Sequence, residues 1–185
     1  RRRRLAGQAA LTAVQVLRAI GTGFIGYYVA AILDFKGLEY ISAQMERLAG
    51  AAAARQVELR AELQPAILSC HPEQIGLVFA NLIANAIEYN KPGGTVRVST
   101  RVEAQDVIAA VADSGRGIAP EDLPRIFDRF FRTSQTRASA DGHNGLGLAI
   151  CKSIMHAHGG SIEVASQVDQ GSTFTLRWPL EQANR

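Results

Sequence analysis

The sequence predicts an α+β fold: a two-layer α/β sandwich with a mixed, mostly antiparallel five-stranded sheet and three helices, preceded by an N-terminal helical segment. Two observations predict it. Short segments in which apolar and polar residues alternate, as in half-buried strands, recur after residue 56. Between them lie segments with apolar residues three and four apart, the spacing of a helix with one buried face. Their order along the chain places the helices on one face of a mixed sheet.

Residues 1–37 differ in character from the rest of the chain. Their longest run without a charge, Ala19 to Leu33, has 15 residues, whereas a membrane-spanning helix needs about 20. We therefore favour a helix buried against a partner helix, with a membrane segment or a cleavable signal peptide as alternatives. Residues 38–55 are predicted to form one helix. Apolar residues recur there at helical spacing, at Leu38, Ile41, Met45 and Leu48.

The remaining elements follow as strand, helix, two strands, short helix, helix and two strands. The predicted strands are Val57 to Leu63, Thr95 to Val102, Val107 to Val111, Ser161 to Ser166 and Ser172 to Trp178. One helix begins at Pro72, because Pro is favoured at the first helical position. A short helix is predicted near Leu123 to Phe127 and a longer one over Gly145 to His158. The small, polar residues 132–144 predict a mobile loop.

The composition fits a folded chain of one domain with an appendage, or of two small domains. Hydrophobic residues make up 47% of the 185 residues and charged residues 20%, too few charges for a disordered chain. Much of the net charge of +3 comes from Arg1 to Arg4, so we expect no nucleic acid among the partners. Cys70 and Cys151 lie far apart without a CxxC spacing, which argues against a disulfide framework or a zinc site and fits a reducing, cytoplasmic setting.

The first cluster that can carry chemistry is a pair of amides. Asn81 and Asn85 are four apart on a predicted helix, so their side chains share one face. Amide oxygens are hard ligands that suit Mg²⁺ bound together with phosphate. A pair on the helix surface, or a cap, remains an equal alternative from these residues alone.

The second cluster is a turn directly after a predicted strand. Asp113, Gly115 and Gly117 form a turn in which the glycines let the backbone approach a ligand closely. The carboxylate can accept a hydrogen bond from an exocyclic amine such as that of adenine. Alone, an ordinary Asp-Gly turn would be the better interpretation.

Two further clusters follow along the chain. Phe127, Phe130 and Phe131 supply apolar anchors at helical spacing, and Arg132 comes next. The segment 142–152 is rich in glycine and opens a helix, so its free N–H groups and the positive helix end favour a phosphate. It lacks the Gly-Lys-Ser/Thr ending of a Walker A motif.

In this order the four clusters resemble the N, G1, F and G2 boxes of bacterial two-component sensor histidine kinases, which belong to the gyrase, chaperone, histidine kinase and MutL ATPase superfamily. The segment Gly171 to Phe174 resembles the family's last strand. The resemblance implies that residues 55–181 form an ATP-binding catalytic domain. Residues 1–54 would be a helical segment, a remnant or divergent dimerisation region.

The resemblance also implies roles for single residues and makes ATP and Mg²⁺ the expected cofactors. Asn85 would bind the metal with Asn81 beside it, and Lys152 would add positive charge, so these three would serve catalysis. Asp113 would bind the adenine amine, with Thr173 near it. The residues implied to contact ATP are Asn81, Asn85, Tyr89, Asp113, Gly115, Gly117, Ile118, Arg132, Gly145, Leu146, Gly147, Leu148 and Thr173.

Three features depart from the family or from its relatives. No His precedes His71, so we expect the phosphoacceptor His on a partner chain or on a segment outside this sequence. Glu88 stands where many relatives place Lys or Arg, which implies weaker or differently arranged contacts to the γ-phosphate. Asn81 stands where gyrase- and MutL-type ATPases carry the Glu that activates water, so we expect slow hydrolysis.

The leading functional hypothesis is a protein-histidine kinase domain that transfers the ATP γ-phosphate to a histidine on a dimerisation helix, for two-component signalling. The alternative is a non-catalytic, pseudokinase-like nucleotide-binding module of the same fold. The expected partners are a response regulator receiver domain and the dimerisation and histidine phosphotransfer helices, in a homodimer of the full-length protein. Membrane attachment through the N-terminal segment would place the domain at the cytoplasmic face of the inner membrane.

Overall fold

The computed structural model describes residues 29–66, 70–133 and 144–179. Most of the predicted loop 132–144 and the first 28 residues lie outside the described residues. The described helices and strands are α2 (Val29–Ala54), β1 (Glu58–Leu63), α3 (Pro72–Glu88), β2 (Thr95–Glu103), β3 (Asp106–Asp113), the 3-10 helix η1 (Leu123–Arg125), α5 (Gly147–Ala157), β4 (Ser161–Gln167) and β5 (Gly171–Pro179).

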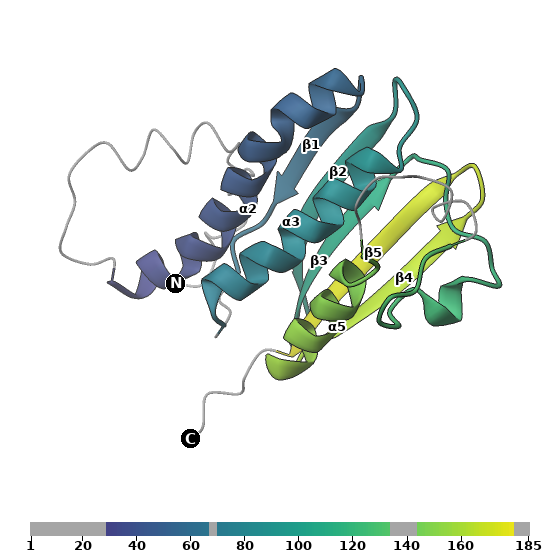
Figure 1. Ribbon diagram of the computed structural model, residues 1–185. Coiled ribbons are helices and arrows are strands. Elements are labelled where there is room, and N and C mark those ends of the chain that lie inside the picture. The colour runs from purple at the N-terminus through teal and green to yellow at the C-terminus, as the bar shows by residue number, and fades with distance from the viewer. Residues whose placement is uncertain (1–28, 67–69, 134–143, 180–185) are drawn as a thin grey trace.

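The sheet has five strands in the order β1-β2-β3-β5-β4. Strands β1 and β2 are parallel, and every other neighbouring pair is antiparallel. Helices α2, α3 and α5 lie on the same side of the sheet (Figure 1). The predicted two-layer sandwich with a mixed sheet is therefore confirmed.

One hydrophobic core fills the space between the two layers. Helix α3 lies at its centre, where Val78, Leu82 and Ile83 have no exposed surface. The apolar side chains of β2, β3 and β5 that face the helices complete this core. Ile41 and Ala52 of α2 belong to the same buried cluster, so the end of this helix packs on the sheet domain.

Helix α2 begins at Val29, earlier than the predicted start at residue 38. Gly37 lies inside the helix, and a single glycine lowers helix stability by about 1 kcal/mol without ending the helix. Helix α3 begins at Pro72 as predicted, with His71 as its N-cap. In the part of the chain that the structure describes, no helix is both long and apolar enough to cross a membrane.

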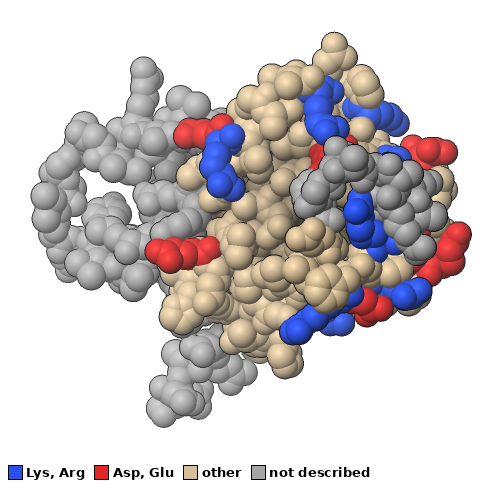
Figure 2. Space-filling model, in the orientation of Figure 1, with Lys and Arg blue, Asp and Glu red and all other residues tan. Residues whose placement is uncertain are grey.

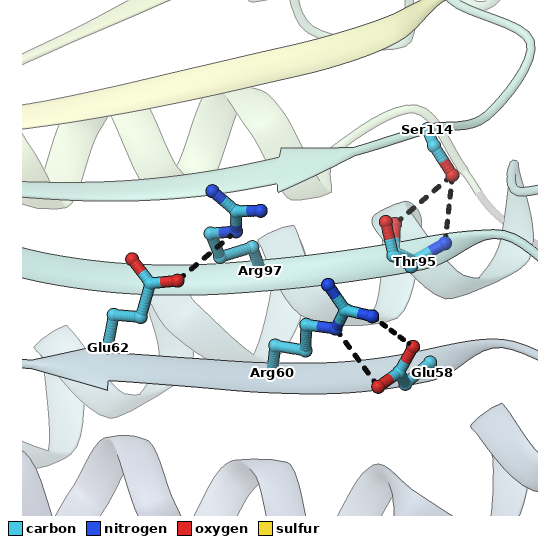
Figure 3. A network of polar contacts seen from close by, with 6 residues as sticks. All are labelled: Glu58, Arg60, Glu62, Thr95, Arg97 and Ser114. Carbon is cyan, nitrogen blue, oxygen red and sulfur yellow. Dashed lines mark hydrogen bonds and ion pairs between the residues drawn. The ribbon is translucent and has the colours of Figure 1, made fainter.

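The other face of the sheet carries charged side chains in ion pairs (Figure 3). Glu58 and Arg60 lie 2.8 Å apart on β1, and Glu62 lies 3.5 Å from Arg97 of β2. These side chains are about half exposed, so each pair stabilises the fold by at most about 1 kcal/mol. The helices therefore cover only the opposite face of the sheet, and the face that carries the ion pairs is open to solvent.

Candidate nucleotide site

The amide pair and the glycine-rich loop, two clusters singled out in the sequence, come together where helices α3 and α5 meet. Asn81 Nδ2 donates to the Leu77 carbonyl at 3.0 Å, which orients the amide. A Cβ added at Gly147, the first residue of α5, would lie 3.0 Å from Asn81 Oδ1. The absent side chain at Gly147 therefore lets the start of α5 lie against Asn81, with Asn85 one turn further along α3.

The start of α5 has backbone donors to offer. Leu146 is its N-cap residue and makes no side-chain cap, so no such bond occupies the first N–H groups of the helix. Such groups and the positive helix end favour an anion. Leu146, Gly147 and Leu148 are half-buried and lie along this first turn.

The glycine-rich loop is joined to the phenylalanine cluster. Phe130 N–H donates to the Gly145 carbonyl at 2.9 Å, and a Cβ at Gly145 would lie 2.7 Å from the Phe131 carbonyl oxygen. Gly145 has φ +65°, and Phe130 has φ +63°, a strained conformation for a bulky residue. The two segments that flank residues 134–143 are therefore held together by these backbone contacts.

Lys152 lies on the exposed side of α5 rather than at its first turn. Its ammonium group is 5.7 Å from the centre of the Phe127 ring. The Phe127 ring in turn packs edge-on against Phe174 of β5, with ring centres 6.4 Å apart. Lys152 of α5 thus places a cation beside the phenylalanine cluster.

Asp113 is the last residue of β3 and its carboxylate is anchored by backbone groups. Gly115 N–H donates to Asp113 Oδ1 at 2.8 Å, and the Ser172 backbone N–H is near enough to lower the pKa of this carboxyl. Burial raises the pKa of Asp113 above its usual range, and the two N–H groups act in the opposite direction. Asp113 is half-buried, and its side chain points to the face of the sheet that the helices cover, as does that of its partner Val96.

The turn after Asp113 is closed on both sides by backbone. A Cβ at Gly115 would collide with the Tyr89 carbonyl oxygen, and one at Gly117 would collide with that of Gln167. Gly117 also has φ +67°. Ile118 N–H donates to Ser166 Oγ at 2.8 Å. Both glycines are therefore required for close packing against protein backbone, whereas the sequence predicted a close approach to a ligand.

Tyr89 follows the end of α3, where the resemblance implies that it lies against the base. The Arg116 guanidinium lies 4.4 Å from its ring centre. Burial raises the pKa of Tyr89, Glu88 raises it further, and Arg116 and Arg132 lower it. Arg132 is thus close enough to influence the Tyr89 hydroxyl, which brings the end of the phenylalanine cluster near the end of α3.

A small open pocket of about 230 Å³ lies beside this ring. Its lining residues are Glu88, Tyr89, Asn90, Lys91, Gly115, Arg116 and Asp169. Only Tyr89 and Gly115 belong to the predicted nucleotide-binding set. The pocket therefore adjoins the Asp113 turn on its outer side.

The structure places Thr173 differently from the expectation. Phe174, Leu176 and Trp178 of β5 are buried in the core. Because side chains alternate along a strand, Thr173 points to the open face and Ser172 to the side of Asp113. Ser172, 7% exposed, is therefore the residue of β5 beside Asp113. The alternation of buried and exposed residues around Phe174 is the sequence signal that identifies Ser172.

The predicted residues fall into two neighbouring groups. Asn81, Asn85, Gly145, Leu146, Gly147 and Leu148 lie where α3 meets α5, and Asp113, Gly115, Gly117, Ile118 and Tyr89 lie at the ends of β3 and α3. Most Lys and Arg atoms visible in Figure 2 lie on the right-hand half of the view. Within the described residues, no three His, Cys, Asp or Glu side chains are grouped to hold a metal.

Comparisons with known proteins identify relatives of this chain. Residues 70–182 match the family model described as histidine kinase-, DNA gyrase B-, and HSP90-like ATPase. The sensor-like histidine kinase SenX3 of Mycobacterium tuberculosis is 43% identical over 141 residues, which are 75% of this chain and 34% of that protein. The sensor protein SrrB of Staphylococcus aureus is 40% identical over 107 residues, or 58% of this chain and 18% of SrrB.

Two solved structures have a similar fold. The mycobacterial sensor histidine kinase MprB matches with a TM-score of 0.67 and 26% identity, over 77% of this chain and 93% of that one. Full-length ShkA in complex with AMPPNP matches with a TM-score of 0.69 and 25% identity, over 82% and 31%. The chain spans about a third or less of the length of the curated relatives named above.

Proposed function

The chain belongs to the family of histidine kinase-, DNA gyrase B- and HSP90-like ATPases, and from this we propose that it is the ATP-binding kinase domain of a sensor histidine kinase. In this proposal residues 55–181 are the catalytic domain and residues 1–54 a helical segment that leads into it. The observation that carries the proposal is the contact of Gly147 with Asn81, which joins an amide-bearing helix to an uncapped helix start.

The side chains and backbone groups present fit Mg-ATP. The amide oxygens of Asn81 and Asn85 would hold Mg²⁺ together with phosphate oxygens, and the N–H groups at the start of α5 would bind the phosphates. The Asp113 carboxylate would accept from the adenine amine, with the Tyr89 ring against the base. Lys152 and Arg132 would add positive charge beside the phosphates.

Transfer is favoured over hydrolysis by the residue at position 81. An amide cannot take a proton from water, whereas the carboxylate of gyrase-type ATPases can. The protein's task is then to position the γ-phosphate and to neutralise its charge while an imidazole nitrogen of the acceptor attacks it. ADP leaves as the phosphorus–nitrogen bond forms.

The partners follow from the relatives. The acceptor histidine would lie on dimerisation helices of the longer protein or of a partner chain, and a response regulator receiver domain would take the phosphate next. We also propose that the full-length protein is a homodimer at the cytoplasmic face of the inner membrane. The alternative of a non-catalytic module has no support from these comparisons.

Transfer of labelled phosphate from ATP to a purified helical hairpin that carries an acceptor histidine tests the proposal. The wild-type chain is expected to label the hairpin, and Asn85→Ala to reduce labelling by at least a hundredfold, because the metal loses a ligand. Gln74→Ala, an exposed change at the start of the same helix, is the matched control and should label normally. ATP binding without any transfer to the hairpin would contradict a kinase.

A further inference from the structure

Two hydroxyl groups join the ends of β4 and β5 to the turn after β3. Ser166 Oγ and Ser172 Oγ lie 3.0 Å apart. Ser166 is half-buried and Ser172 is 7% exposed. Neither hydroxyl belongs to the glycine-rich and amide clusters from which the nucleotide site was predicted.

Ser166 connects three groups through one oxygen. It accepts from Ile118 N–H at 2.8 Å and donates to the Gly171 carbonyl at 3.0 Å. A hydroxyl has one hydrogen and two lone pairs, so Ser166 can also accept from the Ser172 hydroxyl. All its capacity for hydrogen bonds is then used, and alanine could replace none of it.

The partners of Ser166 surround Asp113. Ser172 of β5 lies beside Asp113, next to the Ala112–Thr173 pair of the sheet, and its backbone N–H lowers the pKa of the Asp113 carboxyl. Gly171 packs so closely that a Cβ there would collide with the Asp113 carbonyl oxygen. Ile118 lies on the other side, at the end of the turn whose Gly115 N–H also binds the carboxylate. Ser166 therefore holds the groups on both sides of Asp113 in place.

We propose that Ser166 is a positioning residue for the nucleotide base. Its hydroxyl fixes the turn 115–118 against β4 and β5, and thereby fixes the position at which Asp113 meets the adenine amine. This inference rests on the proposed function. Ser166 acts through Ile118 and Ser172 rather than by touching the nucleotide. Its loss leaves the Ile118 N–H without its acceptor, and the turn gains other arrangements in which the base is held less well.

Three variants test the hydroxyl itself. Ser166→Ala removes it, and Ser166→Thr keeps it on a residue that suits a strand. Ser161→Ala is the control, an exposed serine at the other end of the same strand. We expect Ser166→Ala to bind AMPPNP roughly tenfold more weakly, the loss of about one hydrogen bond, and the other two variants to bind like wild type. Amide hydrogen exchange should speed up at Ile118 in Ser166→Ala alone.

Two results would overturn the inference. One is a Ser166→Ala protein with wild-type affinity and a protected Ile118 amide. The other is equal weakening in Ser166→Ala and Ser166→Thr, which would show that side-chain shape matters and the hydroxyl does not. Should Ser166→Ala not fold, Ser166→Cys keeps the shape with weak hydrogen bonding and should bind more weakly too. A wild-type chain that binds no AMPPNP would refute the proposed function instead, while Ile118 exchange would still decide whether Ser166 holds the turn.

Discussion

Asp113 carries a conflict between function and stability. Its carboxylate is needed ionised to accept from an amine, yet burial raises its pKa. A carboxyl whose folded pKa exceeds its unfolded value of about 3.9 favours folding when protonated. That contribution is present at low pH and is lost as the pH rises through the folded pKa.

Asp113→Asn removes this titration. We expect the free energy of unfolding of the variant, relative to wild type, to increase as the pH rises from about 3 to 6. Urea unfolding at several pH values measures it. Glu121→Gln, a change at an exposed carboxyl, serves as control. A difference between Asp113→Asn and wild type that stays constant over this range would show that Asp113 titrates at its ordinary pKa.

Gly147 is a second residue whose replacement should affect the site more than the fold. Alanine there puts a Cβ 3.0 Å from Asn81 Oδ1, so Asn81 or the helix start must shift by a few tenths of an ångström. We expect the affinity for AMPPNP to fall about three- to tenfold, while helix propensity compensates in stability.

The matched control for Gly147→Ala is Gly50→Ala in α2, where a Cβ meets nothing within 4 Å. This variant should bind AMPPNP normally and gain up to about 1 kcal/mol of stability. Calorimetry and thermal unfolding together check both variants. Unchanged affinity in Gly147→Ala would mean that the contact of α5 with Asn81 does not shape the site.

At the scale of elements, the packing of α5 on α3 can be probed through Cys151. This thiol is fully buried, its Sγ lies 3.9 Å from the Val78 carbonyl, and burial raises its pKa to about 12. Cys70, just before α3, is half-buried and its pKa is also raised by burial.

Iodoacetamide at pH 8 should therefore modify Cys70 slowly and leave Cys151 intact in the folded protein, because the thiolate is the nucleophile and the buried thiol is inaccessible. Mass spectrometry of peptides measures both sites, and labelling in denaturant should modify both at similar rates. Modification of Cys151 as fast as Cys70 under native conditions would show that α5 leaves α3 readily.

The helices and strands were largely predictable because their burial follows regular periods. Strands β2 to β5 lie within about two residues of the predicted ranges, and helix α3 begins at the predicted Pro72. The predicted start of helix α2 is too late, because a glycine inside a helix resembles a helix boundary when only local propensity is weighed. The predicted short helix after Pro120 is the single 3-10 turn η1.

The candidate site was predictable in part. Asn81 and Asp113 could be predicted because each belongs to a motif, and such motifs are recognised from the order of residues along the chain alone. Ser166 and Ser172 depend on the register between β4 and β5, which the sequence does not specify by composition. The resemblance to the family's last strand implies Thr173, although the alternation around Phe174 assigns it to the open face.

At the scale of the whole molecule, the amide pair and the glycine-rich loop meet where α3 packs against α5, and Asp113 lies at the neighbouring end of the sheet. A nucleotide that spans them would bind with its base and its phosphates on different elements. Binding should therefore depend on both groups of residues and on Mg²⁺.

The most direct test of this account is calorimetry of AMPPNP binding, with and without Mg²⁺, by wild type, Asp113→Asn and the control Asp106→Asn. We expect micromolar, Mg²⁺-dependent binding that Asp106→Asn keeps and Asp113→Asn loses by at least tenfold. Absence of binding by the wild-type chain, or equal affinity in Asp113→Asn, would contradict a nucleotide site built on these residues.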